Sequence, residues 1–165
     1  SLGVRDFSTD SINWMPNNTL VTTNSLYAVS SGADKLVAVG GNGVILYSTN
    51  GTNWSNVLVG HTNNLFDVTY SNGQFVAVGE QGVVLTSSNG QTWLAQNSGT
   101  LSNLRGITFG MDKFVAVGDG GTILSSSDAV SWAQQSSGTN QPSKGGLNGS
   151  FALSRWTVLL ASITR

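Results

Sequence analysis

Short hydrophobic runs separated by Gly, Asn and Ser make up most of the chain. Between residues 65 and 96, four such runs follow one another, each containing Val, Leu, Phe, Tyr or Trp, which favour strands. The turns between them carry Asn-Gly or Gly, which supply the positive φ of tight hairpins. No window has the 3.6-residue period of a helix. The pattern predicts four antiparallel strands over Leu65–Tyr70, Gln74–Gly79, Gly82–Ser87 and Gln91–Gln96.

The same pattern recurs at a fixed distance along the chain. Leu36 to Trp54 reads LVAVGGNGVILYSTNGTNW, Phe75 to Trp93 reads FVAVGEQGVVLTSSNGQTW, and Phe114 to Trp132 reads FVAVGDGGTILSSSDAVSW. Each segment begins 39 positions after the one before it. A period of this size indicates a repeat architecture, in which each unit buries its apolar faces against its neighbours. The sequence therefore predicts an all-β protein with one domain over residues 1–165 and repeated four-stranded sheets at about 24–60, 63–99 and 102–138.

The two ends of the chain resemble parts of one further unit. Val4–Trp14 aligns with Val44–Trp54 and would supply a third and a fourth strand, while Gly149–Ser154 and Arg155–Ser162 would supply the first two. A composite unit of residues 4–15 and 147–165 would close the chain as a fourth sheet and remove its exposed edges.

Composition narrows the classes of partner. Charged residues make up 9% of the 165 residues and the net charge is -1, so nucleic acid is not expected as a partner. The chain has no cysteine and no apolar run near 18 residues, so neither disulfides nor membrane insertion is predicted. Its polarity comes from Ser, Thr, Asn, Gln and Gly, a surface style that favours an extracellular or periplasmic location.

Three turns before tryptophan resemble a known motif. Ser48–Trp54 (STNGTNW), Ser87–Trp93 (SSNGQTW) and Ser126–Trp132 (SSDAVSW) are similar to the Asp-box, or BNR repeat, of sialidase-like propellers. The whole repeat also resembles the propellers of the photosystem II stability and assembly factor group. The spacing is one residue shorter than in the motif, Asn replaces Asp in two turns, and Ala129 and Ser11 replace Gly.

The resemblance implies a β-propeller whose blades are these sheets. Four blades would then come from one chain, with the terminal strands sharing a blade. Alternatively, two chains would form an eight-bladed ring. The resemblance places the Asp-box turns on the outer rim, where a short Asp or Asn side chain accepts turn N–H bonds and the indole packs between sheets. A structural role is thus expected for Asp10, Trp14, Asn50, Trp54, Asn89, Trp93, Asp128 and Trp132.

The sequence lacks the residues that a sialidase-like hydrolase or a metal site would need. Sialidase-like hydrolysis needs an arginine cluster, a Tyr–Glu pair and an acid, whereas the chain has one glutamate, Glu80, and no arginine that recurs in the repeat. His61 is the only histidine, so a metal site is not expected, and no cofactor is predicted. The chain is predicted not to be an enzyme.

One face of the propeller would carry the loops that enter the first strand and leave the second. The resemblance brings Tyr27, Phe66 and Arg105 to one aligned strand position, with Asp67 and Arg105 on neighbouring blades able to form an ion pair. A small polar-ligand site is predicted at Tyr27, Asp67, Glu80, Arg105 and Asp119. Alternatively, the charged pair only fills the channel.

The function that fits best is a non-catalytic propeller that recognises a protein or a glycan through loops on one face. Two alternatives stay open. One is a sialidase-like glycoside hydrolase. The other is a shortened propeller segment that assembles by strand exchange with a second copy, giving a homodimer.

Overall fold

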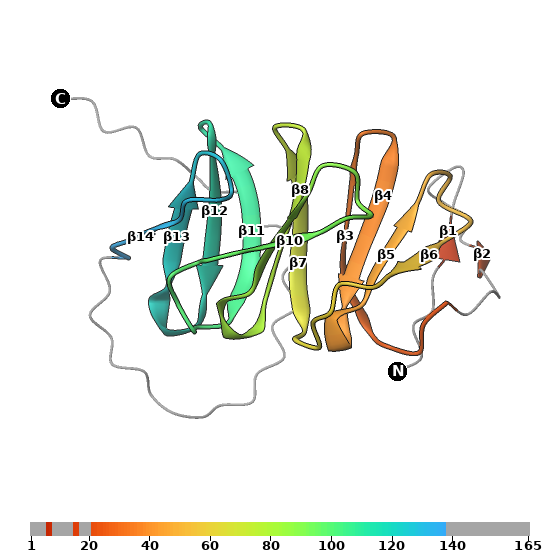
Figure 1. The fold of residues 1–165 in the computed structure, drawn as a ribbon, viewed down its shortest axis with the longest axis horizontal. Coiled ribbons are helices and arrows are strands. Elements are labelled where there is room, and N and C mark those ends of the chain that lie inside the picture. Colours follow the sequence, from red (N-terminus) through yellow and green to blue (C-terminus); the bar gives the residue numbers. More distant parts are fainter. Residues whose placement is uncertain (1–5, 8–14, 17–20, 138–165) are drawn as a thin grey trace.

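The computed structural model describes residues 6–7, 15–16 and 21–137. It contains three four-stranded antiparallel sheets in which strands consecutive in sequence are neighbours, so the all-β prediction is confirmed (Figure 1). We call them the first, second and third blade. The first contains β3 (Leu26–Gly32), β4 (Lys35–Gly40), β5 (Ile45–Ser48) and β6 (Ser55–Val57). The second contains β7 (Leu65–Ser71), β8 (Gln74–Gly79), β9 (Val84–Ser87) and β10 (Leu94–Gln96). The third contains β11 (Leu104–Gly110), β12 (Lys113–Gly118), β13 (Ile123–Ser126) and β14 (Ala133–Gln135).

Two strands of the second blade begin later than predicted. The third strand was expected from Gly82 and begins at Val84, because Gly82 belongs to the one-turn 3-10 helix η2 (Glu80–Gly82). The fourth was expected from Gln91 and begins at Leu94, because the preceding residues form a side-chain-bonded turn. Equivalent 3-10 turns, η1 (Gly41–Gly43) and η3 (Asp119–Gly121), occur in the other two blades.

The hairpins between the first and second strands use three different residue pairs, Ala33–Asp34, Asn72–Gly73 and Met111–Asp112. Asn72 and Gly73 have φ of 49° and 74°, the left-handed conformation that a two-residue hairpin favours. Met111 and Asp112 adopt the same conformation in the third blade, with φ of 52° and 58°. Asn and Gly adopt positive φ readily and Met does not, so the same turn is less favourable in the third blade.

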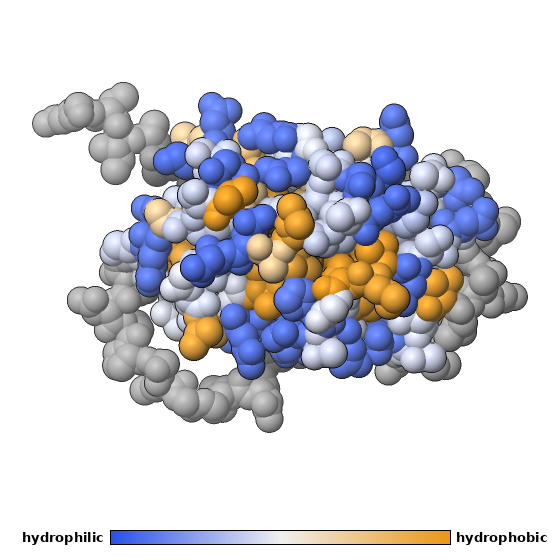
Figure 2. Space-filling model, viewed as in Figure 1, coloured by the Kyte–Doolittle hydropathy of each residue, from blue (hydrophilic) through white to orange (hydrophobic). Residues whose placement is uncertain are grey.

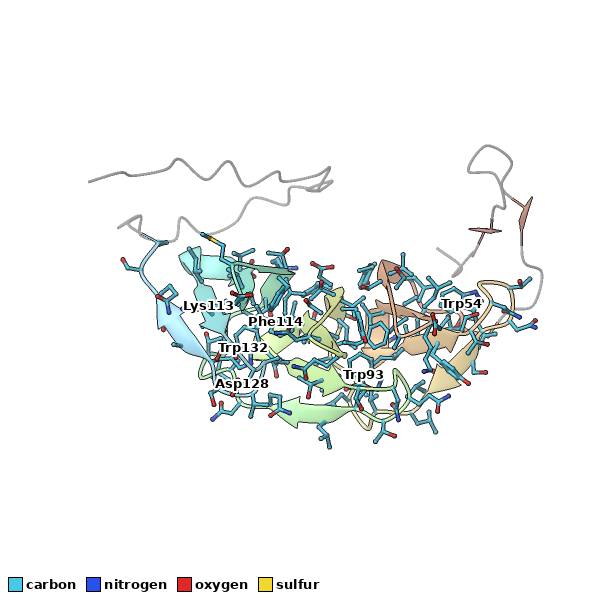
Figure 3. All side chains as sticks on the ribbon, turned by 90° about the horizontal axis from the view of Figure 1, so that it is seen from above. Trp54, Trp93, Lys113, Phe114, Asp128 and Trp132 are labelled. Carbon is cyan, nitrogen blue, oxygen red and sulfur yellow. The ribbon has the colours of Figure 1, made fainter. Side chains whose placement is uncertain are left out.

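The core lies between the blades, which stand side by side in chain order (Figure 1). One apolar cluster joins the first and second blades and a second cluster joins the second and third. Figure 3 shows Trp54, Trp93 and Trp132 spread along this row, one from each blade. Hydrophilic residues cover much of the face seen in Figure 2, and with 9% charged residues in the chain this surface is mainly uncharged.

A fourth, two-stranded sheet precedes the first blade in sequence. Its strands β1 (Asp6–Phe7) and β2 (Met15–Pro16) pair antiparallel, with Phe7 opposite Met15. The partner strands predicted at 147–165 lie outside the described residues, as do Asp10 and Trp14. The composite fourth blade therefore stays a prediction.

Candidate functional site

The first strand of every blade carries a β-bulge at the same place. The register breaks between Leu26 and Ala28 in β3, and the same break recurs in β7 and β11. A bulge leaves one residue out of the ladder and redirects its side chain, and bulges are over-represented next to functional sites. The residues left out are Tyr27, Phe66 and Arg105, which we call the bulge row.

The bulge row brings three blades into direct contact. The ring centroids of Tyr27 and Phe66 are 6.0 Å apart, and the Cζ atom of Arg105 lies 4.4 Å from the Phe66 ring centroid. A guanidinium over a ring at this distance contributes about 0.5–1 kcal/mol at an exposed site. Tyr27 is 49% exposed and the Arg105 side chain is half-exposed, so the row lies open to a partner.

Arg105 is held by Asp119 of its own blade. Its Nε donates to Oδ1 at 3.0 Å and its Nη2 donates to Oδ2 at 2.9 Å. The hydrogen bond from Arg105 is the main cause of a lowered pKa of the Asp119 carboxyl, and the Asn103 amide adds to the effect. The same bond raises the pKa of Arg105, to which the charge of Glu80 contributes.

Two asparagines link the turns of adjacent blades. Asn64 Oδ1 accepts the N–H of Asn42 from the first blade at 2.9 Å, and its Nδ2 donates to Glu80 at 2.7 Å. Asn103 repeats this arrangement one blade later, accepting the N–H of Gln81 at 3.0 Å and donating to Asp119 at 2.9 Å. The acidic side chains beside the bulge row are thereby fixed in position.

This linkage was not predicted from the sequence, although the repeat contains its signal. An Asn directly before the first strand is followed 16 residues later by an acid, as Asn64 by Glu80 and Asn103 by Asp119. The first unit has Ser25 in place of the Asn and Gly41 in place of the acid.

The predicted ion pair between Asp67 and Arg105 is wrong. Arg105 forms its ion pair with Asp119, at 2.9 Å between Nη2 and Oδ2. Asp67 instead accepts the N–H of Ile107 on the third blade and its neighbour Val68 N–H, both at 2.8 Å. Burial is the largest effect on Asp67 and raises the pKa of its carboxyl. Asp67 thus satisfies backbone N–H groups beside two bulges, which is a structural role.

The Asp-box-like turns lie at the opposite end of the strands. Ser48 at the start of this turn pairs with Leu36, whereas the bulge lies where Leu26 pairs with Gly40. Asn50 Oδ1 accepts the N–H groups of Thr52 and Asn53 at 3.0 and 2.8 Å. Asn89 and Asp128 make equivalent bonds, and the indole N–H groups of Trp54, Trp93 and Trp132 donate to carbonyls three residues earlier.

These bonds explain the acidity of Asp128. Donation from the Ser131 and Val130 N–H groups lowers the pKa of its carboxyl to about 2. The bonds to the Asp128 side chain are internal to the turn, and Gln74 of the second blade donates to the Asp128 carbonyl at 3.0 Å, so the turn has a structural role.

Neither metal ligands nor a membrane-spanning helix mark this chain within the described residues. No three His, Asp or Glu side chains of residues 21–137 gather in a way that could hold a metal ion. No helix in the same part of the chain is long and apolar enough to span a bilayer.

Comparison with known proteins supports the fold. Neither a scan against protein-family models nor a search of curated proteins finds a match. A solved structure of YCF48 bound to D1 peptide is 19% identical with a TM-score of 0.60, covering 77% of this chain and 44% of that chain. YCF48 from Cyanidioschyzon merolae is 20% identical with a TM-score of 0.55, covering 74% and 45%.

The chain thus spans less than half the length of these two structures. Their likeness agrees with the three antiparallel sheets and with the propeller predicted from the repeat. The chain has the fold of a β-propeller segment, with three complete blades in the part that the structure describes.

Proposed function

We propose that this chain is a non-catalytic binding propeller that recognises a segment of another protein at the bulge row. The observation that carries the proposal is the recurrence of the bulge in three blades, which aims Tyr27, Phe66 and Arg105 into one half-exposed row. An aromatic pair followed by a cation offers apolar contact, hydrogen bonding and charge to a peptide laid across the blades. Aromatic residues and Arg are also the residue types that dominate protein interfaces.

The structural neighbour bound to a D1 peptide supports a protein segment as the ligand class. That neighbour binds a peptide on a similar fold. Because it is only 19% identical, the contact residues proposed for this chain come from the geometry of this chain. The three side chains of the bulge row come from three adjacent blades, so an extended peptide that crosses the blades can contact all three.

Acid–base catalysis fits the same face poorly. Both carboxylate oxygens of Glu80 accept hydrogen bonds from Asn64, and those of Asp119 accept from Arg105 and Asn103. Acids held in this way stabilise the turns. General acid catalysis needs a carboxyl with a raised pKa facing the substrate. The lowered pKa of Asp119 is the opposite condition. Asp67 has a raised pKa, but its two carboxylate oxygens accept the backbone N–H groups of Val68 and Ile107.

A library of random peptides displayed on phage tests the proposal. We expect selected peptides to bind wild type, and Tyr27→Ala and Phe66→Ala each to weaken binding about tenfold, as loss of an aromatic hot spot does. Leu94→Ala is the matched control, since Leu94 is an exposed apolar residue on the outer strand β10. It should leave binding unchanged.

Two results would overturn the proposal. One is selected peptides that lose affinity with Leu94→Ala and keep it with both bulge-row variants. The other is a chain that binds no peptide and binds members of a glycan array, which would favour the glycan alternative.

A further inference from the structure

The charged residues at the bulge-row end of the strands do not balance. Within residues 21–137, this end carries three acids and one base, namely Asp67, Glu80, Asp119 and Arg105. The two lysines of the same part of the chain begin the second strands at the hairpin end, where Lys35 pairs with Gly32 and Lys113 with Gly110. The bulge-row end therefore carries more negative than positive charge.

Two of the three acids already have their partners within the fold. Asp119 forms an ion pair with Arg105, at 2.9 Å between Oδ2 and Nη2. Asp67 is half-buried, and its two oxygens accept the backbone N–H groups of Val68 and Ile107. Neither carboxylate needs a group from a ligand to complete its contacts.

Glu80 is the acid whose charge is not compensated. Its Oε2 accepts the backbone N–H of Asn64 at 3.0 Å, and its Oε1 accepts the Asn64 Nδ2 at 2.7 Å. Both donors are uncharged, so they fix the carboxylate in place without neutralising it. In the part of the chain that the structure describes, the ion pair between Arg105 and Asp119 is the only one. Glu80 is half-buried, which leaves part of the residue open to a ligand.

Glu80 lies between the strands that carry Phe66 and Arg105. It is the first residue of η2, and this turn lies against β11, the strand of Arg105. Its backbone N–H donates to the carbonyl of Asn64 at 2.9 Å, and Asn64 directly precedes β7, the strand of Phe66. The carboxylate is thus held beside the middle of the bulge row.

The aromatic end of the bulge row reaches the same asparagine. A Cβ atom on Gly41 would lie 3.3 Å from the Tyr27 hydroxyl and 3.5 Å from Asn64 Oδ1, so these two groups lie on the same turn. Tyr27 is 49% exposed, and its ring centroid lies 6.0 Å from that of Phe66. The stem of a basic side chain packs well on exposed rings while its charged end reaches a carboxylate.

We propose that the peptide bound at the bulge row carries a lysine or arginine whose charged group pairs with Glu80 and whose stem lies on Tyr27 and Phe66. This inference rests on the proposed function, because it names the charge of the ligand at that site. Arg105 does not call for an acidic ligand, since Asp119 already compensates its charge through two hydrogen bonds. An acidic side chain in the same place would instead be repelled by Glu80.

The peptides selected from the phage library test the charge of the ligand directly. We expect most of them to carry Lys or Arg at one shared position. In a synthetic copy of the tightest binder, exchange of that residue for Gln should weaken binding to wild type about tenfold, because a partly desolvated charge pair is lost. Isothermal titration calorimetry measures the change. This exchange leaves the protein unaltered, so it does not depend on the folding of a variant.

A matched pair of protein variants locates the partner of the basic residue. Glu80→Gln removes the charge and keeps an amide oxygen that can accept from Asn64, and it should weaken binding of the basic peptide about tenfold. The Gln-exchanged peptide should bind Glu80→Gln about as well as it binds wild type, because the two changes remove the same contact. Asp34→Asn is the control, since it removes the same charge from an exposed hairpin residue at φ 56°, which Asn adopts readily. It should leave binding unchanged.

The outcomes separate this inference from the proposed function. Selected peptides that need Tyr27 and Phe66 but lack a basic residue, or carry an acidic one, overturn the inference and leave the proposed function standing. So does a loss of affinity that is as large with Asp34→Asn as with Glu80→Gln. A chain that binds no peptide, or binds peptides that are insensitive to both bulge-row variants, overturns the proposed function and this inference with it.

Discussion

The second and third blades carry nearly the same sequence and meet different surroundings. The segment Phe75–Gly79 and the segment Phe114–Gly118 both read FVAVG, yet Val78 is fully buried and Val117 is 46% exposed. Among the described residues, the second blade packs against both the first and the third, whereas the third packs against the second alone. Burial in a repeat protein is therefore set by the adjacent unit, since each unit covers the next.

The largest contrast is expected in the core. Phe75 is fully buried, with its ring centroid 4.7 Å from that of Tyr70, whereas the equivalent Leu36 of the first blade is half-buried. Phe75→Ala should lower the free energy of unfolding by about 3–5 kcal/mol through lost burial and a cavity. Leu36→Ala should lower it by about 1–2 kcal/mol, because less area leaves water on folding. Urea unfolding measures both, and equal losses would show that the blades are equally covered.

Asp67 provides the next contrast, since its equivalents are Ala28 and Gly106. Asp67→Ala leaves the Ile107 N–H without its acceptor on the second blade and should destabilise the fold by about 1–3 kcal/mol. Ala28→Gly is the control in the first blade and should have a smaller effect. Thermal unfolding of the two variants compares them, and an unchanged midpoint for Asp67→Ala would contradict the role given to this carboxylate.

The pH dependence of this effect follows from the raised pKa of Asp67. Its folded pKa lies above its unfolded value of 3.8, so the carboxyl contributes most below that value and the contribution is lost as the pH rises through the folded pKa. The stability advantage of wild type over Asp67→Ala should thus be larger at pH 3 than at pH 7. Unfolding titrations at the two pH values check the sign.

The hairpin of the third blade should become more stable when it carries the turn residues of the second blade. Met111→Asn together with Asp112→Gly reproduces Asn72–Gly73, which adopts the same positive φ without a comparable penalty. The free energy of unfolding is expected to rise by roughly 1 kcal/mol. The reverse exchange, Asn72→Met with Gly73→Asp, should lower it by a similar amount. A pair of exchanges that shifts stability in the same direction would contradict this comparison.

The smallest effect concerns the Asp-box-like turns. Asp128 in the third blade titrates, while Asn50 and Asn89 in the other two do not. Because its folded pKa of about 2 lies below the unfolded 3.8, its contribution is present above 3.8 and is lost as the pH falls toward 2. Amide exchange at residues 129–132 should speed up over that range, and Asp128→Asn should remove the acid dependence. Equal acceleration in the second-blade turn, at residues 90–93, would argue against this origin.

The repeat made the fold predictable, and single residues limited the prediction of the site. The 39-residue period and the Asn-Gly turns give the strand order, because local turn chemistry and strand propensity agree in each unit. The bulge could not be predicted from the alignment of the repeats. Each unit has its extra residue at the same position, so the 39-residue period is unchanged. Arg105 was assigned to Asp67 because both were placed on the channel, but Asp119 lies within reach in its own blade.

Amide hydrogen exchange with and without a library-selected peptide tests the binding face most directly. The account predicts slower exchange in the bound state around the bulges, at residues 26–28, 65–67 and 104–106, with no change in the turns at 48–54, 87–93 and 126–132. Protection of the three turns together with unchanged bulges would contradict it.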